Sequence, residues 1–257
     1  MKDFPGRGRL IGLLAKSFAA PRVATADGFL MELDCAEWLQ LEILAKGSAE
    51  PLTLALLTQL LREGDTYIDV GAHVGHHSLV AARACGNTGR VIAIDPQPYN
   101  ADRIARNAEC NGLSNIATVC AAVGNRDQFV KLHLQNETDR ARLSFSLPNP
   151  NDLNCVIEVP MRRLDTLLTA YDTARVKLLK VDVEGFELEV LEGLGGCIGD
   201  CENVIFELLE ATEAYKARAL IEYMLTNGFQ LSDITGNPWE LGQPLPEANV
   251  WASKTAL

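Results

Sequence analysis

Residues 66–77 read Thr-Tyr-Ile-Asp-Val-Gly-Ala-His-Val-Gly-His-His, an apolar run followed by two glycines and a histidine-rich segment. The run at 66–70 is typical of a buried strand, and residues 75–85 have the pattern of a helix. Gly71 permits a tight turn between them. Gly75 opens the helix, where free N–H groups and the positive end of the helix dipole can face a ligand. The stretch therefore predicts a ligand-binding turn between a strand and a helix.

The alternation of strands and helices continues along the chain. We expect further strands at 90–94, 116–123, 176–183 and 204–208, and helices at 98–110, 186–194 and 212–227. Strands that alternate with helices at this spacing favour a mostly parallel sheet with helices on both faces. The predicted fold class is α/β.

Two regions depart from this alternation. Residues 1–48 precede the first strand–turn–helix unit and are expected to form a helical or extended cap on a domain that covers 49–257. The segment at about 124–160 begins with an alternating strand at 128–134, passes through a polar, turn-rich part and returns as a strand at 155–161. We interpret it as a β-hairpin insertion. Both regions are candidates for the walls of a site at the carboxyl ends of the strands.

Length and charge narrow the function further. The chain has 257 residues, of which 47% are hydrophobic, and its 23 basic and 34 acidic side chains give a net charge of −11. This composition suits one large globular domain and excludes a disordered, collagenous or coiled-coil chain. A negative surface repels phosphate backbones, which argues against a nucleic-acid partner. Residues 1–22 are basic, and a helix at their apolar run is expected to cap the domain.

The cysteines and the hydropathy indicate a cytoplasmic protein. Seven cysteines are scattered without a C-x-x-C pair, and we expect reduced thiols and no metal site. No apolar run approaches the ~18 residues of a transmembrane segment.

The position of Asp95 indicates which cofactor the turn binds. Asp95 follows Gly75 by twenty residues, at the end of the second strand, where a carboxylate can accept hydrogen bonds from ribose hydroxyls. A dinucleotide needs a G-x-G-x-x-G cradle for its pyrophosphate, whereas this turn has His73 between Gly71 and Gly75. S-adenosylmethionine has no phosphate, and its ammonium group suits Asp69. The sequence therefore favours S-adenosylmethionine over a dinucleotide.

Four segments together resemble the FkbM family of methyltransferases. They are Asp69–Gly75, Ile94–Pro98, Leu179–Gly193 and Val204–Glu207, and the Lys-Val-Asp-Val-Glu-Gly block within the third is the most specific. The resemblance spans about residues 64–210 and implies an S-adenosylmethionine-dependent enzyme with a Rossmann-like, seven-stranded sheet. It further implies an acceptor hydroxyl on a sugar or a polyketide-type metabolite. His73 departs from the family pattern, which more often has asparagine there. The expected cofactor-binding residues are Asp69, Gly71, Ala72, His73, Gly75, Asp95 and Pro96.

Methyl transfer to a hydroxyl requires alignment of donor and acceptor and removal of a proton. The two-residue period of a strand places Lys180, Asp182 and Glu184 on one side, with both acids at its carboxyl end. We expect Asp182 to be the base or to orient the acceptor, with Glu184 as second candidate and Lys180 as their charge partner. Glu207, which ends the next strand, is expected to orient the acceptor or the two acids.

Other interpretations stay open. In a structural one, Glu184 caps the following helix and Lys180 closes a buried pair; in another, His76 or His77 is the base. Alternative functions are an NAD-dependent oxidoreductase and a non-catalytic cofactor-binding module. The expected partner is a small-molecule or glycan acceptor, and a homo-oligomer, nitrogen as the acceptor atom and an assisting divalent metal are left open.

Overall fold

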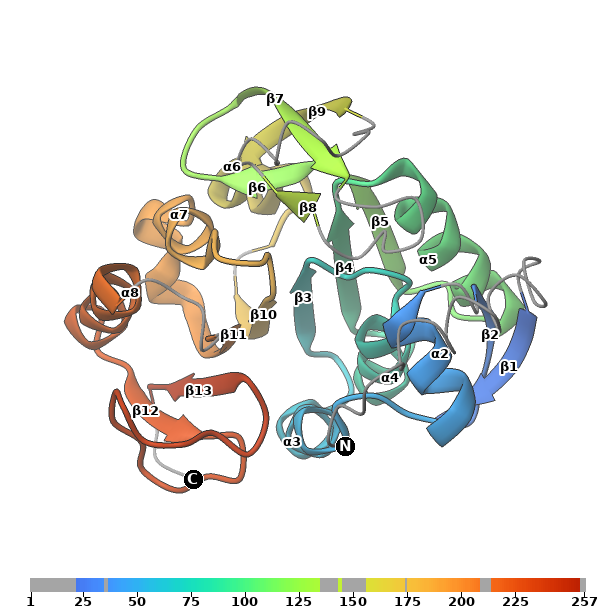
Figure 1. Cartoon of the computed structure of the whole chain (residues 1–257), viewed down its shortest axis with the longest axis horizontal. Coiled ribbons are helices and arrows are strands. Elements are labelled where there is room, and N and C mark those ends of the chain that lie inside the picture. The colour runs from blue at the N-terminus through green and yellow to red at the C-terminus, as the bar shows by residue number, and fades with distance from the viewer. Residues whose placement is uncertain are drawn as a thin grey trace, which may run out of the picture. The chain divides into compact units, whose positions relative to one another are not determined.

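The computed structural model describes residues 22–34, 37–134, 143–144, 156–173, 175–208 and 214–254. Figure 1 labels the helices and strands of these residues. The residues fall into two compact units, each of which takes two stretches of the chain. The first unit takes its residues from 1–49 and 131–158, and the second from 50–130 and 159–257. None of the helices in this part of the chain is both long and apolar enough to cross a membrane. The helix expected near the N-terminus lies outside the described residues.

The first unit contains a hairpin and a helix. Strands β1 (Arg22–Ala26) and β2 (Phe29–Leu33) pair antiparallel, followed by α2 (Trp38–Lys46). Asp27 and Gly28 connect the strands with positive φ angles of 48° and 81°, as a two-residue hairpin turn requires. The unit also holds the pairing of the end of β7 (Gln128–Leu134) with β8 (Leu143–Ser144).

The second unit is built on a seven-stranded sheet of order β12-β13-β11-β10-β3-β4-β5. The five strands from β11 to β5 are parallel and β13 is antiparallel to both its neighbours, which confirms the predicted seven-stranded, mostly parallel α/β fold. The strands are β3 (Thr66–Val70), β4 (Arg90–Asp95), β5 (Ile116–Cys120), β10 (Val176–Val181), β11 (Cys201–Glu207), β12 (Gln230–Asp233) and β13 (Asn249–Ser253). The helices are α3 (Pro51–Leu60), α4 (His76–Cys85), α5 (Pro98–Cys110), α6 (Leu164–Ala170), α7 (Glu187–Glu192), the 3₁₀ helix η1 (Gly195–Asp200) and α8 (Ala214–Thr226).

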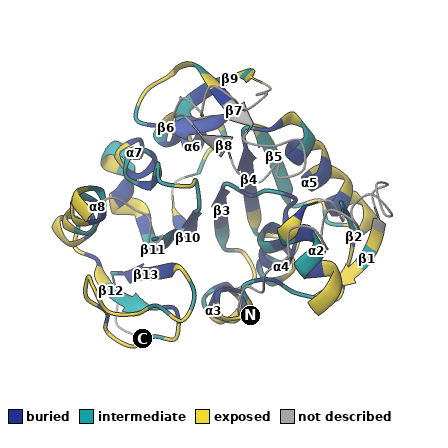
Figure 2. Ribbon diagram, viewed as in Figure 1, coloured by how far each residue is buried: buried dark blue, intermediate teal, exposed yellow. Residues whose placement is uncertain are grey.

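The two faces of the sheet differ in chemistry. On one face Val70 and Val181 belong to the apolar core that also contains Val190 of α7 and residues of α8. On the opposite face, Asp69 accepts a hydrogen bond from Ser78 of α4, and α3 packs over β10. The inner strands are buried on both faces, as Figure 2 shows for β3, β4 and β13, whereas the edge strands β5 and β12 are half-buried. Helices therefore cover both faces, and polar side chains lie beneath α3 and α4.

Three expected elements have different bounds. The strand expected at 116–123 is two strands, because β5 ends at Cys120 and β6 (Ala122–Gly124) pairs with β9 (Val156–Arg163) outside the main sheet. The strand expected at 176–183 ends at Val181, since the chain turns through positive φ angles at Glu184 and Gly185. The helix expected at 186–194 is the shorter α7, and Gly195 and Gly196, which follow the expected helix, begin η1.

Candidate functional site

The turn between β3 and α4 contacts strand β4 and the residue that follows β10. The N–H of Gly71 donates to the Ile94 carbonyl of β4 at 2.9 Å, and a Cβ on Gly71 would lie 1.8 Å from the Asp182 carbonyl oxygen. Gly71 also has a φ of 85°, as does Gly75 at the start of α4. Both positions favour glycine for conformational reasons, and Gly71 lacks room for any side chain. The turn thus lies directly beside the end of β10.

The Asp95 carboxylate, at the end of β4, fixes the turn. It is 5% exposed, and its Oδ2 accepts a hydrogen bond from the His73 N–H at 3.0 Å. Its Oδ1 accepts from the Gln97 N–H at 2.9 Å and the Asn100 side chain at 3.1 Å. Burial raises the pKa of Asp95 to about 6, although these hydrogen bonds act to lower it. Among the residues that the structure describes, Oδ2 has one donor, so it retains the capacity for one further hydrogen bond.

The structure thus brings five sequence-predicted residues together at the ends of β3 and β4: Gly71, Ala72, His73, Asp95 and Pro96. Gly75 follows them at the start of α4. Asp69 lies earlier in the chain, within β3, and is 1% exposed. In the pairing of β3 with β10, Asp69 is the partner of Lys180.

Lys180 is the buried centre of a charged cluster whose members Asp182 and Glu50 are half-buried. It is 2% exposed, and its Nζ lies 2.6 Å from Asp182 Oδ2 and 3.9 Å from Glu50 Oε2. Burial alone would lower the pKa of Lys180, but the charges of Asp182, Glu50 and Asp69 outweigh burial and hold the pKa above its usual range. Lys180 is therefore a permanent cation, and the expected pairing of Lys180 with Asp182 is present.

Glu50 is the member of this cluster that the sequence did not indicate. It directly precedes α3, and its Oε2 lies 3.2 Å from His77 Nε2 of α4. Burial would raise the pKa of Glu50, yet Lys180 and His77 together lower it well below its usual range. His77 thus belongs to the charged cluster. We name Lys180, Asp182, Glu50, Asp69 and His77 the Lys180 cluster.

Glu207 ends β11, next to β10. Its Oε2 is buried and makes no hydrogen bond with any residue that the structure describes. Burial, together with the charges of Asp182 and Glu184, raises the pKa of Glu207 to about 10. Glu207 is therefore a neutral carboxylic acid at pH 7. Within the described ranges, no group of three or more His, Cys, Asp or Glu side chains is placed to hold a metal ion.

Glu184 does not share a strand face with Lys180 and Asp182, because β10 ends before it. Glu184 is exposed and has a φ of 56°, in the loop that leads to α7. The loop is instead held by Glu187, whose Oε1 accepts hydrogen bonds from the N–H groups of Val183 at 3.2 Å and Gly185 at 3.0 Å. The alternative in which Glu184 caps this helix is wrong, since Glu187 binds the loop N–H groups.

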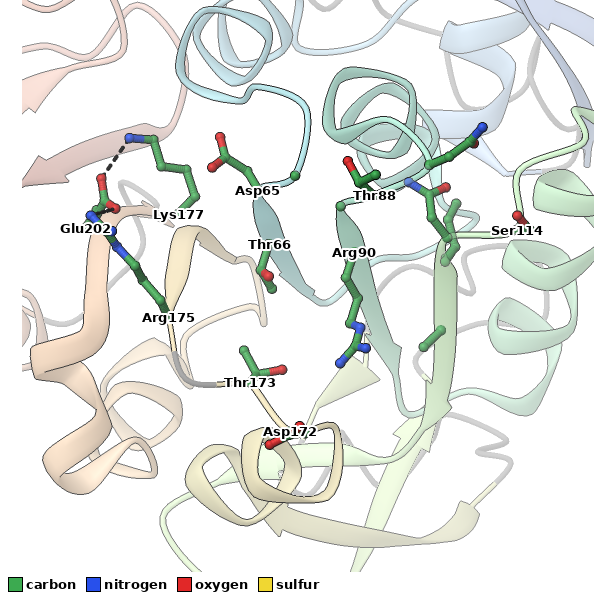
Figure 3. A pocket seen from close by; sticks show the side chains of 16 residues that line it. Asp65, Thr66, Thr88, Arg90, Ser114, Asp172, Thr173, Arg175, Lys177 and Glu202 are labelled. Carbon is green, nitrogen blue, oxygen red and sulfur yellow. Dashed lines mark hydrogen bonds and ion pairs between the residues drawn. The ribbon is translucent and has the colours of Figure 1, made fainter.

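A cavity of about 920 Å³ lies at the opposite, amino-terminal edge of the same strands. Thr66, Arg90, Lys177 and Glu202, from the first residues of β3, β4, β10 and β11, contribute to its wall (Figure 3). Glu202 pairs there with Lys177 at 2.7 Å and with the more exposed Arg175. In open α/β sheets ligands bind at the carboxyl ends of strands. This cavity is therefore separate from the predicted site.

The neutral state of Glu207 has a measurable consequence for stability. Because its pKa is raised from 4.5 to about 10 on folding, Glu207 favours the folded state less and less as pH rises between those values. We expect the free energy of unfolding to fall more steeply between pH 6 and 9 in the wild type than in Glu207→Gln, which carries a permanently neutral side chain. Urea unfolding of both proteins at pH 6 and pH 9 tests this prediction. An equal change in the free energy of unfolding with pH in the two proteins would contradict it.

Comparisons with known proteins identify the family and agree with the fold. The family model described as Methyltransferase FkbM domain matches residues 69–231. The chain is 24% identical over 206 residues to the hexuronic acid methyltransferase AglP of Haloferax volcanii, covering 77% of this chain and 78% of that protein. It is 26% identical to Methyltransferase 1 of Beauveria bassiana, covering 60% and 69%. A crystal structure of methyltransferase FkbM from Methylobacillus flagellatus covers 83% of this chain and 60% of its own, with 15% identity and a TM-score of 0.50.

Proposed function

Because the chain belongs to the FkbM methyltransferase family, we propose that it transfers a methyl group from S-adenosylmethionine to a hydroxyl of a small molecule. The observation that carries the proposal is the position of Asp182. The Asp182 carboxylate is ion-paired with the buried Lys180, and the backbone carbonyl of Asp182 lies directly beside Gly71 of the β3–α4 turn. A base is thus held next to the turn that is expected to bind the methyl donor.

The residues at the turn fit S-adenosylmethionine. The Lys180 cluster holds more carboxylates than cations, which suits the ammonium and sulfonium charges of the cofactor. The free hydrogen-bonding capacity of Asp95 Oδ2 suits a ribose hydroxyl. We assign Asp69, Gly71, Ala72, His73, Gly75, Asp95 and Pro96 to cofactor binding. A dinucleotide fits less well, because the turn lacks the second glycine of a pyrophosphate cradle.

In this proposal each acidic residue has a separate role. S-adenosylmethionine supplies a methyl group on a good leaving group, so the protein must align the acceptor and take its proton. Asp182 accepts the hydroxyl proton, and Lys180 fixes the Asp182 carboxylate by their ion pair. Glu207, which is neutral, can donate a hydrogen bond to the acceptor oxygen. Glu184, exposed in the loop beside Asp182, is the second candidate for orienting the acceptor.

Two observations support a small-molecule or glycan acceptor. The similarity to a protein named as a hexuronic acid methyltransferase favours a sugar or glycan, and a polyketide-type metabolite is the other small-molecule class in the proposal. The net charge of −11 argues against a nucleic acid. We also propose a cytoplasmic location, which the free thiols at the described cysteines support (Cys85, Cys110, Cys120, Cys197 and Cys201).

Calorimetry with two ligands tests the cofactor assignment. We expect S-adenosylhomocysteine to bind and to raise the melting temperature, whereas NAD does neither. Asp95→Ala should weaken binding of S-adenosylhomocysteine by about 1–3 kcal/mol, the usual loss for hydrogen bonds to a charged group. Glu202→Gln, at the opposite edge of the sheet, should bind like the wild type. Binding of NAD in place of S-adenosylhomocysteine would overturn the proposal.

Release of S-adenosylhomocysteine tests the acceptor class. The protein is incubated with S-adenosylmethionine and a panel of neutral hexoses, hexuronic acids, hydroxylated polyketides and short RNA. Turnover with a sugar or a polyketide supports the proposal, and turnover with RNA alone contradicts it.

A further inference from the structure

Glu50 has an unusual place at the start of α3. Its φ of 49° lies in the left-handed region, and Pro51 follows it as the first residue of the helix. A non-glycine residue in this region is strained, and such strain often marks a functional position. Glu50 makes no side-chain hydrogen bond that caps α3. The conformation of Glu50 is therefore not explained by the needs of its own helix.

A different carboxylate caps α3. Glu247 Oε1 accepts a hydrogen bond from the Leu52 N–H at 2.9 Å, and its Oε2 accepts from the Thr53 N–H at 2.9 Å and the Thr53 hydroxyl at 2.6 Å. These bonds satisfy the first N–H groups of the helix, as an ordinary capping residue would. The Glu50 side chain is thus available for the sheet beneath, where it meets His77 and Lys180.

The Lys180 cluster carries a surplus of negative charge. Three carboxylates, those of Asp182, Glu50 and Asp69, act on the single ammonium of Lys180. Glu207 adds no charge, since it is neutral. Even a protonated His77 would leave the cluster negative. Glu50 lies 3.9 Å from Lys180, farther than Asp182 at 2.6 Å, so the Lys180 ammonium is paired mainly with Asp182. Asp69 is buried, whereas the side chains of Asp182 and Glu50 are half-buried. Negative charge in such surroundings without enough cations is unfavourable, so the cluster favours a bound cation.

The two cofactor states differ by one positive charge. S-adenosylmethionine carries a sulfonium, whereas its product S-adenosylhomocysteine has a neutral thioether at the same position. Resting on the proposed function, we propose that Glu50 makes this site select the cationic donor over the neutral product, through the surplus charge of the Lys180 cluster. Glu50 acts at a distance and without contact with the acceptor, so it is a positioning and selectivity residue. Its effect is to favour release of the product after transfer.

Calorimetry with three ligands tests the inference without any acceptor. The full-length wild type should bind S-adenosylmethionine, and the cationic analogue sinefungin, more tightly than S-adenosylhomocysteine. Glu50→Gln keeps the shape of the side chain and removes its charge. A carboxylate several ångströms from a cation in partly buried surroundings changes affinity by roughly tenfold. We expect Glu50→Gln to lower the ratio of donor to product affinity by about that factor.

Glu247→Gln is the matched control, because it alters a carboxylate at the start of the same helix outside the Lys180 cluster. It should lower the melting temperature and leave the affinity ratio unchanged. An unchanged ratio in a folded Glu50→Gln protein would overturn the inference. If Glu50→Gln does not fold, the inference is tested on the wild type alone. Equal affinity of the wild type for sinefungin and S-adenosylhomocysteine would refute selection by charge. Absence of binding by all three ligands would refute the proposed function itself.

Discussion

Replacing Asp182 with asparagine will lower methyl transfer by about 10²–10⁴-fold, the usual contribution of a general base, and will leave binding of S-adenosylhomocysteine nearly unchanged. The reason is chemical, since an amide has the shape of the carboxylate but cannot take the acceptor proton. Lys180 stays charged in this variant, because Glu50 and Asp69 still face it. The measurement is the single-turnover rate with the acceptor identified by the product-release assay, together with calorimetry of S-adenosylhomocysteine binding.

Two further variants make the result for Asp182 specific. Glu202→Gln removes another carboxylate that pairs with a lysine, Lys177, at the amino-terminal edge of the sheet, and should keep full activity. Glu184→Gln tests the second candidate and should have a smaller effect, because Glu184 is exposed and is not held by Lys180. Full activity of Asp182→Asn would refute the assignment of the base. A larger loss in Glu184→Gln would transfer that role to Glu184.

The sequence was sufficient for the features that depend on local pattern. The run at 66–70 and the glycines that follow it predict β3 and its turn, since a buried strand and a left-handed glycine have strong sequence signals. The order of strands and helices predicts the mostly parallel sheet. The pairing of Lys180 with Asp182 was also predictable, because residues two apart in a strand lie on one side.

Features that depend on distant contacts were not predictable. Glu50, which precedes α3, lies near Lys180 of the distant strand β10, and the N–H groups of α3 are capped by Glu247, which comes much later in the chain. The prediction that Glu184 shares a strand face with Lys180 and Asp182 was wrong. The backbone conformation, and not the side-chain pattern, ends β10 at Val181. One signal is present in the sequence: a lysine in an apolar strand requires acidic partners, and Glu50, directly before Pro51, is such an acid.

Replacing Lys180 with methionine will destabilise the protein by about 3–5 kcal/mol at neutral pH, because buried carboxylates then lose their cation. The loss will depend on pH. In the wild type the lowered pKa of Glu50 means that its pairing stabilises the fold above pH 4.5, and this contribution is lost as pH falls further. In the variant the attraction of Lys180 is gone, and for Glu50 only weaker influences such as His77 still oppose burial. The carboxylate pKa values are therefore higher than in the wild type, and the variant loses stability relative to the wild type as pH rises above 4.5. The deficit relative to wild type is therefore larger at pH 8 than at pH 5.

Urea unfolding at pH 5 and pH 8 measures this deficit, and Lys177→Met supplies the matched control. Lys177 lies in the same strand, but its side chain is 28% exposed and pairs with Glu202, so its loss should cost about 1 kcal/mol or less at either pH. The double variant Lys180→Met with Asp182→Asn should recover part of the lost stability, since it also removes one of the unpaired charges. A deficit no greater than that of Lys177→Met would show that the carboxylates around Lys180 do not depend on its charge. A deficit equal at both pH values would contradict the coupling of this cluster to protonation, because an uncompensated buried carboxylate must take up a proton as the pH falls.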